Sequence, residues 1–489
     1  MKRSKHSLSH YRLFSADMGK IVPIGLTEVL PGDTIQQATS ALVRVTPLAT
    51  PVMHPVNVKI HHWFVPNRIV WDDWESFITG GEDGADTSTF PTIDVSAVSG
   101  NGTLADYLGI PAACGEPVNA LPFRCYAKIY NEWYRDQDLQ TALTIDTTDG
   151  TDTTTNTTLQ SANWEKDYFT TARSSTQKGA DVSLPLGTSA DVVSDVSATN
   201  TDVEVGNTNV AGNTWKFDIG AGGELDFNTT AAGTPNLYAD LTNATAATIG
   251  QLREAIAKQR YAEMRMRYGG RYVEYLRSLG IRSSDARLQR PEYLGGGKQT
   301  ISFSEILQTG VDSSDAGVGT LKGHGIGAMR TNRYRRFFEE HGFVVSLMIV
   351  QPKTMYVQGL PKHWSRSTKE DFFQRELQTI GQAAVLNKEI YEAHTTPNGT
   401  FGYQDRYDEY RRGISSVHGE FRDASIYQDW HMARIFSSDP ALNSTFVTSN
   451  PTNRVYQDQT NDPLLIMANH SIQARRMVMK NGTPGGVIL

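Results

Sequence analysis

The chain has 489 residues, of which 39% are hydrophobic and 20% are charged, a composition that supports a sizeable core and excludes a wholly disordered chain. Its formal net charge is -7, so the chain as a whole lacks a basic signature and any nucleic-acid contact must be local. Two cysteines, Cys114 and Cys125, are too few for a disulfide framework and favour a reducing cytoplasm. We expect neither export nor membrane insertion, because no signal region follows the basic start and no apolar run approaches the roughly 20 residues of a membrane span.

Residues 1–140 predict short strands and two short helices. Val56 to Val65 alternates apolar and polar residues, and prolines delimit this segment as they do Ala41 to Pro47. One helix is predicted from Asp72, where carboxylates occupy the first turn, and another from Tyr126 to Leu139, where apolar side chains share one helical face.

Residues 141–250 differ in kind, because Thr, Asn, Asp, Gly and Ala dominate and acidic residues exceed basic ones. This composition is typical of long surface loops or of a small solvated β-subdomain, with Trp215 to Ile219 as one strand. Disorder of the polar stretches is the alternative. The chain is therefore divided into residues 1–187, a surface insertion at 188–245, and residues 246–489.

The last part begins with a helix from Ile249 to Leu279 that Gly269 and Gly270 break or kink. Further strands are predicted at Gln299–Phe303, Gly342–Val350, Met355–Val357, Ser415–Glu420 and Ile472–Met479. Strands at both ends of the chain, separated by long insertions and few helices, indicate a mainly β fold. An antiparallel β-sandwich or jelly roll fits this pattern.

No catalytic, metal or cofactor site is visible in the sequence, and an enzyme is not expected. The glycine-rich string Gly323 to Gly327 lacks the strand-to-helix context of a phosphate loop and is predicted to be a mobile loop. His61 and His62 lie in a strand pattern, where neighbouring side chains point to opposite faces and cannot share one metal ion.

Local basicity is the one positive signal. Arginine neutralises phosphates, and nearby aromatic rings offer stacking faces, so basic segments that hold aromatic residues suit single-stranded nucleic acid. Arg253 to Arg290 is one such stretch, for which a solvated helix face is an equal alternative. The candidates for facing DNA are Lys2, Arg3, Lys5 and Arg12 at the amino terminus, and Arg330, Arg333, Arg335 and Arg336 around Tyr334.

Several strings in the right order resemble the major capsid protein of the Microviridae, especially its gokushovirus branch. They cover most of the chain outside residues 188–245. The strings are Leu30–Asp33, His54–Gly81, Leu121–Gln140, Asp167–Gly179, Tyr268–Gly296 and Phe401–Arg411. The segment Ala172 to Thr176 departs from the family pattern, which leaves the local contacts there open.

The resemblance implies a viral jelly roll repeated in a small T=1 icosahedral shell that encloses circular single-stranded DNA. It implies a virion component assembled in the cytoplasm of a bacterial host, with the long insertion as a surface protrusion. Residues 188–245 are predicted to be this protrusion and the host-attachment element, because they are polar, poor in aromatic residues and outside the matched strings. The implied partners are further copies of the chain, the DNA genome, a small basic DNA-binding virion protein, a pilot protein and a host cell-surface receptor.

Aromatic and arginine residues in long connections are the expected anchors of subunit contacts, because such residues dominate binding energy at interfaces. They are Trp133, Tyr134, Trp364, Arg366, Phe372 and Phe373. Two other functions remain open from the sequence alone. One is a secreted or surface-displayed β-rich protein that binds carbohydrate, and the other is an enzyme on a β-sandwich, such as a glycosidase.

Overall fold

The computed structural model describes residues 3–82, 84–180, 182, 249–310, 317–423 and 425–479, together with the backbone of five strands between residues 191 and 240. The chain forms two compact units. The first unit comprises residues 1–176 and 268–489, and the second comprises residues 177–267.

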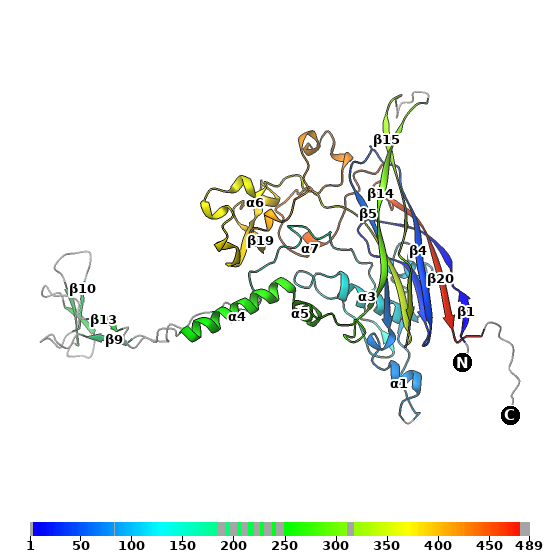
Figure 1. Cartoon of the computed structure of the whole chain (residues 1–489), viewed down its shortest axis with the longest axis horizontal. Coiled ribbons are helices and arrows are strands. Elements are labelled where there is room, and N and C mark those ends of the chain that lie inside the picture. The colour runs from blue at the N-terminus through cyan, green and yellow to red at the C-terminus, as the bar shows by residue number, and fades with distance from the viewer. Residues whose placement is uncertain are drawn as a thin grey trace. The chain divides into compact units, whose positions relative to one another are not determined.

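A ten-stranded antiparallel sheet forms the frame of the first unit (Figure 1). Its main path runs β1-β20-β4-β15-β14-β5-β17-β3, while β2 pairs with β20 and β16 pairs with β4. The predicted mainly β, jelly-roll class is confirmed. The strands are β1 Ser4–Ser7, β2 His10–Ala16, β3 Val22–Val29, β4 Thr34–Val45, β5 Val56–Pro66, β14 Glu292–Leu307, β15 Leu321–Arg330, β16 Tyr334–Phe337, β17 Gly342–Pro352 and β20 Leu464–Arg476.

The two ends of the chain meet in this sheet. Strand β20 pairs with β4 from Leu464 opposite Val45 to Arg475 opposite Thr34. On its other edge β20 pairs with β1 and β2, so the amino-terminal strands are held by the carboxyl-terminal strand. The insertions between these strands therefore leave the frame without interrupting it.

One half of the sheet is covered on both faces. Every residue of β17 is buried, and β5 is buried at all but two positions. Their inner side chains enter the core of the sheet, whereas Trp63, Val345 and Leu347 pack on helices α2 (Leu104–Leu108) and α3 (Leu121–Ile129). Burial on both faces explains why the sequence of β17 is a continuous apolar run.

The other half of the sheet is open on its outer face. Buried and exposed residues alternate along β20 and β15, so one face of each strand enters the core and the opposite face meets solvent. The exposed fraction of Leu13 in β2 reaches 83%. We call the open face of β1, β2, β4, β15, β16 and β20 the bare sheet face.

A polar layer divides the buried core between the strands. His62 lies 2.8 Å from the Ser346 hydroxyl, and His470 lies 2.9 Å from the Thr39 hydroxyl and 2.7 Å from the carbonyl oxygen of Ile24. On one side of this layer lies an apolar cluster that includes Val43, Ile60, Met348 and Ile466. On the other side lies a cluster that includes Ile35, Phe64, Val344 and Ile472. Because its polar atoms are paired internally, the layer fixes how the strands face one another.

The remaining elements are short. The helices of the first unit also include α1 Trp74–Thr79, α5 Tyr272–Ser278, α6 Asn387–Ile390 and α7 Ser444–Val447, and its small sheets hold β6 Thr92–Ile93, β7 Val118–Asn119, β8 Thr151–Asp152, β18 Gln382–Leu386 and β19 Thr400–Asp405. The second unit contains most of α4 Ile249–Tyr268, a three-stranded sheet of β10 Val203–Gly206, β11 Thr214–Ile219 and β12 Leu225–Asn228, and the pair β9 Asp191–Ser194 and β13 Leu237–Asp240.

Most of the long predicted elements are confirmed. The helix predicted from Ile249 ends at Tyr268 and resumes at Tyr272, as the two glycines required. The helix predicted from Tyr126 begins earlier, at Leu121, and continues as a π-helical turn, Tyr130–Tyr134. Two predicted strands were wrong, because Met355–Val357 forms only isolated bridges at Tyr356 and Ser415–Glu420 runs into a 3-10 helix.

The prediction of a mobile loop at Gly323 to Gly327 was also wrong, since this segment is part of β15. Its glycines face the core, where a Cβ on Gly325 would lie 2.8 Å from both Phe303 and Val45. The glycines therefore allow close approach of neighbouring side chains, which is one reason for glycine inside a strand.

The polar layer predicts that acid destabilises the fold. Burial lowers the pKa of His62 to about 3 and that of His470 to about 4. The unfolded chain therefore takes up protons below about pH 6.5, while the folded chain stays neutral at these sites. We expect the free energy of unfolding to fall as pH decreases from 6.5 towards 4, by up to about 1.4 kcal/mol per pH unit for each histidine.

The measurement is urea unfolding of the full chain at several pH values between 6.5 and 5. A His470→Gln variant should lose part of the pH slope, and a variant of the exposed His363, His363→Gln, should keep all of it. An unchanged slope in His470→Gln would contradict the assignment.

Candidate nucleic-acid and subunit interfaces

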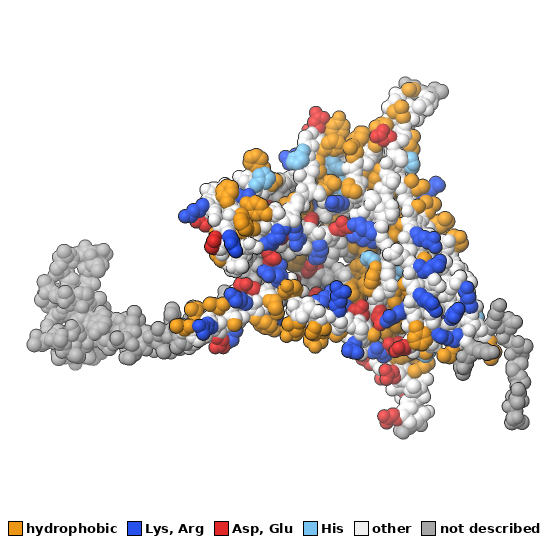
Figure 2. Space-filling model, in the orientation of Figure 1, with side chains coloured by type: hydrophobic (Ala, Val, Ile, Leu, Met, Phe, Trp, Pro, Cys, Tyr) orange, Lys and Arg blue, Asp and Glu red, His pale blue; other side chains and the backbone are white. Residues whose placement is uncertain are grey.

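One end of the bare sheet face carries several cations, and we call it the basic end. Lys5 of β1 lies opposite Arg475 of β20, and Arg335 of β16 lies opposite Gln36 of β4, which in turn lies opposite Gln473 of β20. All three cationic side chains are exposed. Figure 2 shows Lys and Arg side chains gathered over β1, β4 and β20.

The basic end carries an excess of positive charge. None of the six strands of the bare sheet face contains Asp or Glu. Among the described residues, Lys5, Arg335 and Arg475 form no ion pair, and like charges directly opposite each other on neighbouring strands are destabilising. This repulsion is relieved when an anion lies over the sheet.

The other predicted DNA-facing residues lie in different surroundings. Arg3 donates to the carbonyl oxygen of Gly32 at 2.9 Å and lies over the ring of Phe337, so it borders the basic end. Arg336 forms an ion pair with Glu292 at 3.0 Å. Arg330 and Arg333 are exposed at the end of β15 and in the turn that follows, and Lys2 lies outside the described residues.

Arg12 points away from the bare sheet face. It lies opposite the buried Ala468, and its guanidinium donates to the carbonyl oxygen of Tyr107 at 2.8 Å. Burial lowers the pKa of Arg12. These contacts join β2 to the end of helix α2, which is a structural role.

The sequence reading missed Arg475 and Arg44. Both belong to strands in which exposed and buried positions alternate, and both occupy exposed positions. The alternation of apolar and polar residues from Ile472 to Arg475 was the signal that could have placed Arg475 on an open face.

The other end of the bare sheet face is apolar. Leu13, Met467, Leu42 and Ala328 lie opposite one another in a single row across β2, β20, β4 and β15. Leu465 and Ile326 lie in the next row, on either side of Arg44, and are also exposed, so one cation interrupts the apolar residues here. An exposed apolar patch of this kind is typical of a surface that contacts another molecule.

Two of the predicted interface anchors are packed within the protomer. The Trp133 ring lies 4.6 Å from Trp63, and its indole nitrogen donates to the carbonyl oxygen of Pro291. The Tyr134 hydroxyl accepts a hydrogen bond from Trp63 and lies 2.8 Å from His61, which is on the face of β5 opposite His62. Burial raises the pKa of Tyr134.

The other anchors are grouped in the segment from 362 to 380. Trp364 is 72% exposed, and Phe372 and Phe373 are each exposed by about half. Arg366 forms a largely buried ion pair with Glu409 at 3.2 Å and lies over the ring of Tyr410. Arg366 therefore holds the segment in place, while the three aromatic side chains remain open to a partner.

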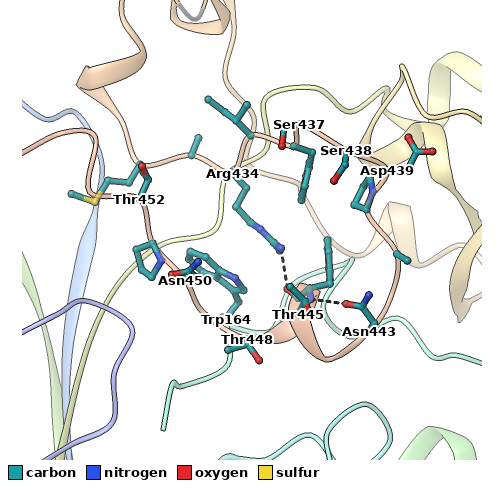
Figure 3. A pocket seen from close by; sticks show the side chains of 18 of the residues that line it. Trp164, Arg434, Ser437, Ser438, Asp439, Asn443, Thr445, Thr448, Asn450 and Thr452 are labelled. Atoms are coloured by element: carbon teal, nitrogen blue, oxygen red, sulfur yellow. Dashed lines mark hydrogen bonds between the residues drawn. The ribbon is translucent and has the colours of Figure 1, made fainter. Parts of the chain in front are cut away.

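A concave site lies in the connection from 432 to 454 (Figure 3). Its volume is about 640 Å³. Arg434 donates to the carbonyl oxygen of Phe446 at 2.9 Å, and its guanidinium lies over the rings of Phe446 and Trp164. Asp439 is the one carboxylate of the lining, and hydrogen bonds from Thr395 lower its pKa. The lining thus offers no pair of carboxylates for acid–base catalysis.

Two further searches concern the described ranges alone. No group of three or more His, Cys, Asp or Glu side chains is placed there to hold a metal ion. None of the helices in this part of the chain combines the length and apolarity of a membrane span.

Comparison with known proteins assigns the chain to a family. Residues 1–485 match the family described as "Capsid protein (F protein)". The capsid protein VP1 of Bdellovibrio phage phiMH2K is 37% identical over 471 residues, which cover 92% of this chain and 88% of the relative. The capsid protein VP1 of Chlamydia phage 1 is 32% identical over 534 residues, covering 92% and 90%, and that of Spiroplasma virus 4 is 35% identical over 485 residues, covering 91% and 87%. The chain thus belongs to the major capsid protein family of the Microviridae phages, whose members are structural components of the virion.

Proposed function

We propose that copies of this chain assemble in the cytoplasm of a bacterial host into a small T=1 icosahedral shell that encloses circular single-stranded DNA. In this proposal the basic end of the bare sheet face contacts the DNA, and residues 188–245 form a surface protrusion that attaches the virion to a host receptor. A small basic DNA-binding protein and a pilot protein are further proposed partners.

One observation carries the DNA contact. Lys5 and Arg475 lie directly opposite each other without a carboxylate among the described residues to neutralise them. The phosphates of a polyanion supply the negative charge that neutralises these cations. Their approach also releases counterions, which favours binding. Repetition over many copies turns a few cations per chain into a strong interior field.

The DNA contact predicts a change in packaging. An Arg335→Gln/Arg475→Gln variant should still assemble, because both side chains are exposed and neither forms an ion pair with another described residue, but its particles should hold less nuclease-protected DNA. The DNA remaining in the variant should be released at a lower salt concentration, since about two phosphate contacts per chain are lost. The absorbance ratio at 260 and 280 nm across the particle peak measures the content.

The matched control changes two exposed cations elsewhere in the first unit, Lys353→Gln/Arg422→Gln. Equal DNA content in both variants and in the parent would remove the basic end from the proposal. A parent particle that contains no DNA would refute the packaging function itself.

The exposed aromatic residues predict a change in assembly. The free energy of unfolding of a Trp364→Ala/Phe373→Ala variant should lie within about 0.5 kcal/mol of the parent's, because these side chains are largely exposed. The variant should nevertheless form fewer particles. A Trp133→Ala variant should instead destabilise the protomer by about 3 kcal/mol, because its ring is packed on Trp63 and Arg290. Urea unfolding and the particle fraction in a sucrose gradient separate the two effects.

The insertion predicts a separable attachment function. Apart from the backbone of five strands, residues 188–245 lie outside the described residues. This range falls within the second compact unit, so its removal should leave the frame of the first unit intact. Particles of a deletion variant should assemble and carry DNA but fail to adsorb to host cells, and normal adsorption by such particles would contradict the attachment function.

A further inference from the structure

A second cationic site lies at the junction of α3 and α5. It is a pocket of about 400 Å³, and its lining includes Lys128, Arg135, Arg271, Tyr272 and Arg290. Helix α3 changes there into a π-helical turn, Tyr130–Tyr134, and such turns are frequent at functional sites.

Two of the four cations have structural partners. Arg271 donates to the carbonyl oxygens of Asn131 and Glu132 within the π-helical turn, and it lies 3.9 Å from the Glu132 carboxylate. Arg290 forms an ion pair with Asp285 at 2.5 Å and lies 4.3 Å from the centre of the Trp133 ring. These contacts hold both guanidinium groups at the pocket wall.

The other two cations lack a carboxylate partner. Among the described residues Lys128 and Arg135 form no ion pair, and the Nε of Arg135 is buried without a hydrogen-bond acceptor. A buried N–H of a charged group without an acceptor is costly. Burial lowers the pKa of Arg271, and Arg135 and Arg290 lower it further, against the effects of Glu132 and Glu274. Four cations thus line the pocket against one carboxylate, that of Glu132, which leaves an excess of positive charge for an anion to neutralise.

A flat aromatic surface adjoins the cations. Tyr272 lines the pocket and is 66% exposed. Its ring lies 6.4 Å from that of Tyr275, with an angle of 20° between the two planes. Exposed tyrosine rings beside cations are the combination that binds single-stranded nucleic acid, because bases stack on the rings while phosphates meet the cations.

We propose that this pocket binds one nucleotide unit of single-stranded DNA, with its phosphate between Lys128 and Arg135 and its base on Tyr272. The site deepens the proposed DNA contact and rests on it, but it uses none of the residues of the basic end. A free nucleotide has the same phosphate and base, so the test distinguishes a DNA strand from free nucleotides as the ligand.

The first experiment is ultraviolet cross-linking of native particles, followed by mass spectrometry of the peptides that carry a nucleotide. A cross-link on Tyr272 or Tyr275 is expected. Particles that contain DNA and give cross-links only elsewhere would overturn the pocket and leave the packaging function standing, whereas particles without DNA would overturn both.

The second experiment measures binding of a labelled oligothymidylate of twelve nucleotides to the purified full-length protein by fluorescence anisotropy. Tyr272→Ala and Lys128→Gln should each weaken binding about tenfold, as expected for the loss of one stacked base or one phosphate contact. The matched controls Tyr261→Ala and Lys369→Gln, which change an exposed tyrosine and an exposed lysine, should bind as the parent does.

Competition experiments identify whether the pocket binds a DNA strand, a free nucleotide or any polyanion. Displacement of the oligonucleotide by unlabelled oligothymidylate, but not by an equal concentration of thymidine monophosphate, supports a strand in the pocket. Equal displacement by the monophosphate shows a site for free nucleotides and overturns the strand. Displacement by a polyglutamate peptide alone, or unchanged binding in both pocket variants, also overturns the proposal.

Discussion

The pairing of β20 with β4 is the interaction on which the rest of this structure depends. It joins residues from the two ends of the chain over the length of β4, and β20 is the strand with which β1 and β2 pair. Without it the bare sheet face does not exist, because four of its six strands are β1, β2, β4 and β20. The same arrangement explains how long insertions are tolerated. They leave from connections at the ends of strands, where additional residues cost little free energy of loop closure.

The two halves of the sheet have different roles. Helices cover β5 and β17, which makes that half a structural core, while β4, β15 and β20 keep one face open. The open face has a basic end and an apolar end, and the cross-strand register fixes which side chains are neighbours in each. A capsid protein requires such faces, since its function arises from contacts with other copies of the chain.

Sequence reasoning recovered the class of the fold and the strands with a strong apolar pattern. β5 and β17 were placed within two residues, β5 because alternating residues lie between delimiting prolines and β17 because its sequence is a nearly continuous apolar run. β15 was missed, since its glycines are required by the neighbouring Phe303 and Val45, which are distant in sequence. The basic character of the amino terminus was recognised, but the face on which each cation lies was not, because that depends on strand register. Lys5 and Arg12 look alike in sequence, yet one is opposite Arg475 on the open face and the other is opposite Ala468 in the core.

The pairing of β4 with β20 also determines when the sheet can be completed during biosynthesis. During translation β4 leaves the ribosome on the order of 400 residues before its partner β20. At bacterial elongation rates this delay is roughly 20 to 80 s, during which β4 can pair with β15 and β16 while its other edge has no partner. An unpaired strand edge is a template for pairing with other chains, so this edge of β4 is open to mispairing until β20 occupies it. A truncated chain that lacks β20 would keep this edge unpaired and would leave β1 and β2 without their strand partner.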